Sequence, residues 1–387
     1  MSLDSENQAG NMQLDQKIYP PLNHIPADIV RANDYERVAA NFIPPDRLAY
    51  VDGGSGHNVT LRANVDAFTK YSILPRSLKD LSEAHTQIQL LSQTYSHPIF
   101  LAPVAHQKLV HPRAEIATAE AAAATDTCMV ASTLSSFSLE DIARNTHSQS
   151  WFQLYFQAKE ADTHALLQRA IRAGYQAIVL TIDASIQVPS DSALKANFTF
   201  PDDMQAANII HQSSSLTPAA ASTNHKSIFL RYMQTAATKE RVQKLLSVST
   251  IPVFIKGVMS DEDALLYQSL GAAGMIVSNH GGRTLDGVPA CLTVLSQLRN
   301  AVGKDYPLLF DSGIRSGADI FKAIALGADA VLIGRLQVYA LSVAGALGVA
   351  HMMKLLKEEL ALCMAIAGCA SIEDIKHSKL HRNTERQ

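Results

Sequence analysis

Eight short apolar runs that alternate with helical patterns constrain the fold of this chain more than any other feature. Each run is apolar on both faces, as expected for parallel strands that are covered by helices. The predicted strands are residues 99–102, 128–131, 152–155, 177–183, 252–256, 274–277, 308–311 and 330–333. Helices are predicted near 113–124, 138–144, 161–173, 260–270, 290–301, 316–326 and 336–367.

Eight strand–helix units favour a closed (β/α)8 TIM barrel of the α/β class. A doubly wound open sheet is the alternative. The turn after the first strand lacks the Gly-x-Gly-x-x-Gly pattern of a dinucleotide-binding fold, so the closed barrel is preferred.

The predicted barrel lies within one domain. We expect a flexible N-terminal tail over residues 1–25, a barrel domain with an N-terminal helical segment over 26–375, and a C-terminal tail over 376–387. A long lid insertion is expected after strand four, over about 184–238, where a polar, low-complexity passage occupies residues 213–222. Residues 57–95 give no clear assignment.

Composition limits the function classes. The chain has 387 residues, is 47% hydrophobic and carries a net charge of −3, without the basic patch of a nucleic-acid-binding protein. Four scattered cysteines show neither metal nor redox spacing, which suggests no metal site and a reducing compartment. No signal peptide or apolar run of about 20 residues is visible, so a cytoplasmic protein without a membrane span is expected.

The hexapeptide Ser-Asn-His-Gly-Gly-Arg at residues 278–283 follows the sixth strand. His280 can carry a proton near neutral pH, and the planar fork of Arg283 suits a carboxylate. Together they suggest a site that holds an acid and removes a proton beside its carboxylate. The alternative is a glycine turn with a hydrogen-bonded loop histidine.

Other strand ends also carry polar side chains, where barrel enzymes gather their catalytic groups. A single one is weak evidence, because Asp183 can cap a helix and Lys256 can reach the surface. Their joint placement favours a site. The residues are Gln153, Tyr155, Thr181, Asp183, Lys256, Ser278, His280, Arg283, Asp311, Gly334 and Arg335.

A phosphate site is predicted in the loops after strands seven and eight. Residues 311–317 read Asp-Ser-Gly-Ile-Arg-Ser-Gly, and Gly334-Arg335 follows strand eight. Such loops offer backbone N–H groups and a helix N-terminus to a phosphate, whereas the alternative is two ordinary glycine turns. A phosphate anchor near a strand-end lysine points to flavin mononucleotide (FMN), whose reduced ring a cation stabilises.

In combination, these motifs resemble the FMN-dependent 2-hydroxy-acid oxidases and dehydrogenases, from about residue 26 to 374. The resemblance rests on the 278–283 hexapeptide, Ile-Lys-Gly at 255–257, Asp-Ser-Gly-Ile-Arg at 311–315 and Gly-Arg at 334–335. Ala-Pro-Val-Ala at 102–105, Phe-Gln-Leu-Tyr at 152–155 and Thr-Ile-Asp at 181–183 also fit.

The resemblance implies oxidation of an L-2-hydroxy acid, lactate-like or larger, to the 2-oxo acid. The implied catalytic residues are His280, Asp183, Arg283, Tyr50, Tyr155 and Lys256. The implied substrate-binding residues are Tyr50, Tyr155, His280, Arg283 and Leu134. The implied FMN-binding residues are Pro103, Val104, Ala105, Ser132, Gln153, Thr181, Lys256, Ser278, Asp311, Gly313, Arg315, Gly334 and Arg335. A homotetramer is also implied.

Two positions depart from the family pattern. Ser190 stands where the family usually carries an arginine that helps bind the substrate carboxylate, and Leu134 stands where short-chain oxidases often carry Trp or Tyr. Dioxygen, giving hydrogen peroxide, is the simplest electron acceptor. A soluble dehydrogenase with another acceptor and an FMN-containing isomerase on a similar barrel are the alternatives.

Overall fold

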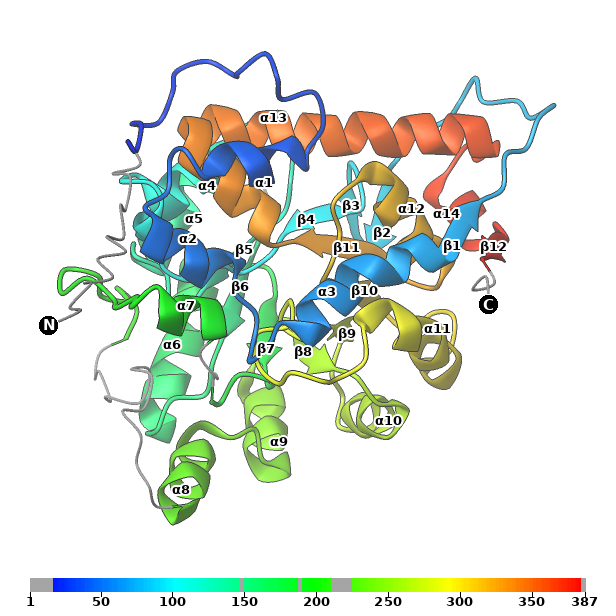
Figure 1. Cartoon of the computed structure of the whole chain (residues 1–387). Coiled ribbons are helices and arrows are strands. Elements are labelled where there is room, and N and C mark those ends of the chain that lie inside the picture. The colour runs from blue at the N-terminus through cyan, green and yellow to red at the C-terminus, as the bar shows by residue number, and fades with distance from the viewer. Residues whose placement is uncertain (1–16, 147–148, 187–189, 210–224, 384–387) are drawn as a thin grey trace, which may run out of the picture.

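The computed structural model describes residues 17–146, 149–186, 190–209 and 225–383 (Figure 1). Eight parallel strands form a closed barrel in chain order, so the predicted (β/α)8 fold is confirmed. Pairing of β11 with β4, with Val331 opposite Ile99, closes the ring. The strands are β4 (Ile99–Leu101), β5 (Met129–Ser132), β6 (Ser150–Leu154), β7 (Ile178–Thr181), β8 (Val253–Val258), β9 (Gly274–Val277), β10 (Leu308–Phe310) and β11 (Ala330–Ile333).

A helix follows each strand and covers the outside of the barrel. These helices are α4 (Ala114–Ala124), α5 (Leu139–Thr146), α6 (Glu160–Arg172), α9 (Lys239–Val248), α10 (Asp261–Ser269), α11 (Cys291–Val302), α12 (Gly317–Ala325) and α13 (Arg335–Ala367). By length and composition α13 could cross a membrane, but 78% of its most apolar stretch is buried inside the protein, as in a core helix.

Aromatic side chains fill part of the barrel interior. The Trp151 ring stacks on Phe254 with centroids 4.6 Å apart and meets Phe100 edge-on at 5.3 Å. A Cβ atom at position 274 would lie 2.2 Å from the Phe254 ring, so glycine is needed there. The interior is therefore packed side chains, which leaves the strand ends for the site.

A hairpin of β2 (Ile88–Leu90) and β3 (Gln93–Tyr95) packs against the start of the barrel. The Tyr95 ring lies 4.8 Å from Phe100, and its hydroxyl accepts a hydrogen bond from Trp151 Nε1 at 3.2 Å. The hairpin thus covers the amino ends of the strands, opposite to the ends that carry the site.

The N-terminal segment contains α1 (Asp34–Ala39), α2 (Pro45–Asp52) and α3 (Val59–Asp66). The first helix begins at Asp34, eight residues after the expected start of the domain at residue 26. The Asp34 carboxylate accepts hydrogen bonds from the backbone N–H groups of Val30 and Arg31, and this holds a turn before the helix. Residues 45–56, which comprise α2 and the glycine turn after it, are called the N-terminal arm below.

Parts of both predicted tails contact the rest of the protein outside the barrel. Of the expected N-terminal tail, residues 17–25 are described, and Leu22 N–H donates to Val343 O in α13 at 2.7 Å. Of the expected C-terminal tail, β12 (Leu380–Arg382) pairs antiparallel with β1 (Tyr71–Ile73), as Figure 1 shows.

The insertion after β7 contains α7 (Asp191–Lys195) and α8 (His225–Thr235). The start of α7 docks on the N-terminal arm, where Asp191 N–H donates to Gly56 O at 3.3 Å and Ser192 Oγ donates to Ala49 O at 3.3 Å. The polar passage predicted at 213–222 lies outside the described residues.

Candidate active site

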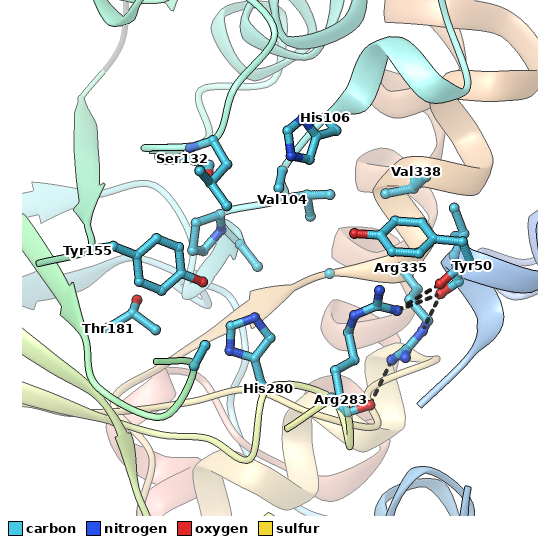
Figure 2. Close-up of a pocket in the computed structure, with 18 of the residues that line it drawn as sticks. Tyr50, Val104, His106, Ser132, Tyr155, Thr181, His280, Arg283, Arg335 and Val338 are labelled. Atoms are coloured by element: carbon cyan, nitrogen blue, oxygen red, sulfur yellow. Dashed lines mark hydrogen bonds between the residues drawn. The ribbon is translucent and has the colours of Figure 1, made fainter. Parts of the chain in front are cut away.

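A cavity of about 900 Å³ lies at the carboxyl ends of the barrel strands (Figure 2). Most of the residues predicted from the sequence line it: Tyr50, Pro103, Val104, Ala105, Ser132, Leu134, Tyr155, Thr181, Lys256, His280, Arg283, Asp311, Gly313, Arg315, Gly334 and Arg335. The other three lie behind this wall, each bonded to a lining residue: Gln153 to Ser132, Asp183 to His280 and Ser278 to Lys256.

A histidine–aspartate pair faces the cavity. His280 Nδ1 lies 2.9 Å from Asp183 Oδ1, and the side chains are only 19% and 12% exposed. Burial would raise the pKa of Asp183, but the attraction of His280 and its hydrogen bond outweigh burial, so that this pKa is lowered. Asp183 is therefore an anion at neutral pH. The Asp183 carboxylate accepts a hydrogen bond from His280 Nδ1–H, so Nε2 of His280 is the nitrogen that can act as the base.

Lys256 supplies a buried cation beside this pair. Its Nζ lies 3.0 Å from Asp311 Oδ2 and donates to Ser278 Oγ at 2.7 Å. Burial lowers the pKa of Lys256, but Asp311 and Asp183 more than compensate, and the net shift is upward. The ammonium thus stays charged in a nearly dry place, where it stabilises negative charge strongly.

Three buried polar atoms at this end of the cavity have no hydrogen-bond partner within the described part of the chain: Gln153 Nε2, Thr181 Oγ1 and Asp183 Oδ2. The other amide atom of Gln153, Oε1, accepts a hydrogen bond from the Ser132 hydroxyl at 3.2 Å. Leaving such groups unpaired costs about 1–3 kcal/mol each. A flat ligand with carbonyl and ring nitrogen atoms would satisfy them.

The loops after β10 and β11 form the phosphate end. Gly313 has φ 93°, and a Cβ atom there would lie 2.3 Å from Asn64 O, so only glycine fits this turn. Gly334 is the residue before α13, whose first N–H groups are available to an anion. Arg315 borders the same space, with its Nε bonded to Glu36 at 2.9 Å.

Two arginines bind the backbone of the N-terminal arm. Arg283 Nη1 donates to the carbonyls of Tyr50, Val51 and Gly53 at 3.0, 3.2 and 2.7 Å. Arg335 donates from Nε to Val51 O at 3.0 Å and from Nη2 to Gly53 O at 2.9 Å. Burial and the charge of Arg283 lower the pKa of Arg335 to about 10, so it remains a cation.

Arg335 differs from the expected simple phosphate ligand, because its Nη1 also donates to Gly281 O at 2.9 Å. Its guanidinium therefore joins the arm to the loop of His280, while its backbone begins α13. Arg283 uses one nitrogen for the arm and keeps its other N–H groups for a carboxylate.

Tyr50 and Tyr155 complete the substrate end (Figure 2). The Arg283 guanidinium lies over the Tyr50 ring, 4.8 Å from the centroid. Burial raises the pKa of Tyr155 well above its usual value, so its hydroxyl is neutral and available as a hydrogen-bond donor. Arg283, Tyr155 and His280 line the same cavity.

The sequence reasoning missed Phe198 and Phe200, which the insertion brings over the arm. The Phe198 ring stacks on Tyr50 with centroids 4.5 Å apart, and Phe200 meets Tyr50 edge-on at 5.2 Å. The signal available was the alternation Phe-Thr-Phe at 198–200. His106 was also missed, although it directly follows the predicted Pro103, Val104 and Ala105 and lines the same cavity.

Ser190 and Leu134, the two departures, both line the cavity. Ser190 Oγ caps α7 by accepting a hydrogen bond from Ala193 N–H at 3.1 Å. A Cβ atom at Gly53 would lie 2.1 Å from Ser190 Oγ, so the arm and insertion are in close contact there. This arrangement leaves no room at position 190 for a longer side chain pointing toward the arm.

Comparison with known proteins agrees with this geometry. The sequence profile of FMN-dependent dehydrogenases matches residues 39–382. The chain belongs to the FMN-dependent dehydrogenase family.

Relatives within this family are similar over nearly the whole chain. An L-lactate oxidase of Alicycliphilus denitrificans is 54% identical over 360 residues, which cover 93% of this chain and 98% of the relative. A peroxisomal (S)-2-hydroxyacid oxidase of Arabidopsis thaliana is 35% identical, covering 92% and 98%. A crystal structure of mandelate oxidase with benzoyl-formic acid superposes with a TM-score of 0.84 at 35% identity, covering 92% and 99%.

The residues of this FMN-dependent dehydrogenase fit its cofactor. The unpaired Gln153 Nε2 and Thr181 Oγ1, together with the Lys256 ammonium, would give a flavin ring the polar partners it needs. The wall of Pro103, Val104 and Ala105 is apolar and suits the face of a ring. At the other end, the Gly313 turn and the start of α13 suit a phosphate.

Proposed function

We propose that this protein oxidises an L-2-hydroxy acid to the 2-oxo acid, with dioxygen as the electron acceptor and hydrogen peroxide as the second product. The observation that carries the proposal is the His280–Asp183 pair at 2.9 Å, which faces a cavity that also holds Arg283 and Lys256. Relatives named for L-lactate and (S)-2-hydroxy acids support the substrate class.

Substrate binding is assigned to Arg283, Tyr50 and Tyr155. The free N–H groups of Arg283 bind the carboxylate, and the Tyr50 ring packs against the guanidinium and fixes its plane. Tyr155 donates its hydroxyl proton to the substrate oxygen. These contacts leave the C2 hydrogen and hydroxyl beside the imidazole of His280.

Proton removal is assigned to His280. Because Nδ1 is held by Asp183, Nε2 is free to accept one proton from the substrate. The positive charge that develops on the ring is then stabilised by the Asp183 carboxylate, which is buried and therefore weakly screened. General base catalysis of this type contributes about 10²–10⁴-fold to a rate.

Bound FMN would supply the acceptor for the two electrons and for the second hydrogen that the substrate loses. Lys256 would favour this transfer, because Asp311 and Ser278 fix its ammonium at the site and its positive charge would stabilise the reduced ring. Gln153, Ser132 and Thr181 would bind the polar edge of the ring.

The test is to mix the purified yellow protein anaerobically with a panel of L-2-hydroxy acids and their D-enantiomers. The flavin absorbance at about 450 nm is then followed. We expect L-acids to bleach the band and D-acids to leave it unchanged. Admitting oxygen should restore the band and release one equivalent of peroxide. Bleaching without reoxidation by oxygen would instead identify a dehydrogenase with another acceptor, and no bleaching by any acid would reject the proposal.

We further propose a cytoplasmic homotetramer. All four cysteines, Cys128, Cys291, Cys363 and Cys369, are free thiols, which supports a reducing compartment. The quaternary state rests on the resemblance to the 2-hydroxy-acid oxidases. Light scattering of the purified protein tests it, and a monomeric mass would overturn it.

A further inference from the structure

A histidine outside the catalytic pair lines the same cavity. Figure 2 shows His106 across the cavity from His280 and Arg283. It lies in the loop after β4, and its ring lies 5.0 Å from Phe200. Its φ of 53° is a left-handed conformation, which few residues other than glycine adopt without cost.

The imidazole of His106 has no hydrogen bond to any described residue. Nδ1 is buried and unpaired among the described residues, and the ring lines the cavity. Burial lowers the pKa of His106 to about 4, so the ring is neutral at physiological pH. With no acceptor near Nδ1, the single proton is better placed on Nε2, where an acceptor in the cavity can take it.

The backbone fixes this ring in position. His106 N–H donates to Leu134 O at 3.0 Å, which joins the loop after β4 to the loop after β5. The buried carboxylate of Glu115 accepts from Gln107 N–H and from Ser136 N–H, both at 3.0 Å, and so fixes the two loops together. These bonds fix the backbone of His106, and the Phe200 ring lies against its imidazole, so the donor is confined to this side of the cavity.

A continuous aromatic wall connects His106 to the carboxylate site. Tyr50 stacks on Phe198, Phe198 meets Phe200 at 5.1 Å, and Phe200 meets His106 at 5.0 Å. A hydroxy acid anchored by its carboxylate at Arg283 therefore directs its side chain along this wall toward His106. The apolar side chains of Leu134 and Met204 line the same cavity.

Resting on the proposed function, we propose that His106 is a specificity-determining residue. Its Nε2–H donates a hydrogen bond to an uncharged oxygen on the side chain of the hydroxy acid. The substrates favoured in this way are L-2-hydroxy acids that carry a hydroxyl or carbonyl group on the side chain, relative to their aliphatic counterparts.

The test compares substrate pairs that differ by one oxygen: L-lactate with L-glycerate, and L-2-hydroxybutanoate with L-2,4-dihydroxybutanoate. The measured quantity is kcat/KM for the acid with the additional oxygen divided by kcat/KM for its aliphatic counterpart. His106→Gln keeps an N–H close to the place of Nε2, while His106→Met has a similar length and no donor. We expect the ratio to persist in His106→Gln and to fall about three- to tenfold in His106→Met, the effect of one hydrogen bond.

Phe200→Leu is the matched control, because it alters the apolar wall and keeps the donor. It should change kcat/KM for both members of a pair in the same proportion. Calorimetric titration of the FMN-loaded variants with pyruvate and 3-hydroxypyruvate repeats the comparison without turnover. The proposal is overturned if His106→Met keeps the wild-type ratios in both experiments.

The outcome is separable from that of the proposed function. If no L-2-hydroxy acid reduces the flavin, the proposed function fails, and the titration alone decides on His106. If the acids reduce the flavin and the ratios do not depend on position 106, only the specificity role of His106 is rejected.

Discussion

Asp183 and His280 lie 97 residues apart in the sequence, yet Asp183 Oδ1 is 2.9 Å from His280 Nδ1. The contact joins the residues that follow β7 and β9, with β8 between them. A Cβ atom at Gly257, in β8, would lie 2.7 Å from Asp183 Cβ, so glycine at that position lets the carboxylate approach the imidazole. The pair therefore depends on three neighbouring strands.

The first prediction concerns this pair. Asp183→Asn removes the charge that stabilises the imidazolium and should slow anaerobic flavin reduction by about 10²–10⁴-fold. Stopped-flow absorbance measures the rate. Asp329→Asn is the control, because Asp329 forms a similarly buried ion pair with Arg299 at 2.7 Å but precedes β11, at the amino end of the strand and opposite to the end that carries the site. Equal rates for Asp183→Asn and the wild type would exclude the role given to the carboxylate.

The second prediction concerns the buried cation. Lys256→Met leaves the Asp311 carboxylate without its partner at 3.0 Å and should lower the free energy of unfolding by about 3–5 kcal/mol. FMN affinity should fall as well. The double variant Lys256→Met with Asp311→Asn removes both charges and should recover part of the stability, while FMN affinity stays low. Urea unfolding and flavin fluorescence measure the two effects, and unchanged FMN affinity in the single variant would contradict this assignment.

The third prediction separates substrate binding from anchoring of the arm. Arg283→Lys keeps the charge but loses the planar fork, and the dissociation constant of pyruvate should rise about 30-fold or more. Arg335→Lys is the control, because Arg335 binds the same Val51 and Gly53 carbonyls. If both variants weaken pyruvate binding equally, loosening of the arm explains the loss and Arg283 has no direct contact with the carboxylate.

The fourth prediction concerns acid stability. Burial lowers the pKa of His97 to about 4 from its ordinary value of 6.5. The unfolded chain therefore binds more protons between these values, and stability that is complete above about pH 6.5 is lost as the pH falls toward 4. The free energy of unfolding that His97 costs over this pH range is roughly 3 kcal/mol. His97→Gln should flatten the plot of unfolding free energy against pH over this window, and parallel plots for the two proteins would refute the argument.

The barrel was predictable because each of its strands is buried on both faces and reads as an uninterrupted apolar run. The β2–β3 hairpin was not. Its strands are only three residues long, and Leu91 and Ser92 occupy the positive-φ positions of the turn, with φ of 52° and 65°. Glycine or asparagine is the usual signal for such a turn, so Leu91 and Ser92 gave no indication of a hairpin.

The same contrast holds for the cavity. His280, Lys256 and Thr181 were accessible to prediction because a closed barrel brings all strand ends to one face. Phe198 and Phe200 were not, because they belong to an insertion whose path no strand register determines. The bonds from Arg335 to the arm depend on tertiary packing alone.

The shared carbonyls of Val51 and Gly53 couple the N-terminal arm to the catalytic end of the barrel. Each carbonyl accepts hydrogen bonds from both Arg283 and Arg335. If the arm detached, the guanidinium groups of Arg283 and Arg335 would lose these shared acceptors together. The arm therefore cannot move away from one arginine without also weakening its hydrogen bonds to the other. The arm and the catalytic end of the barrel consequently behave as one cooperative folding unit, although a surface helix near a chain terminus ordinarily frays independently.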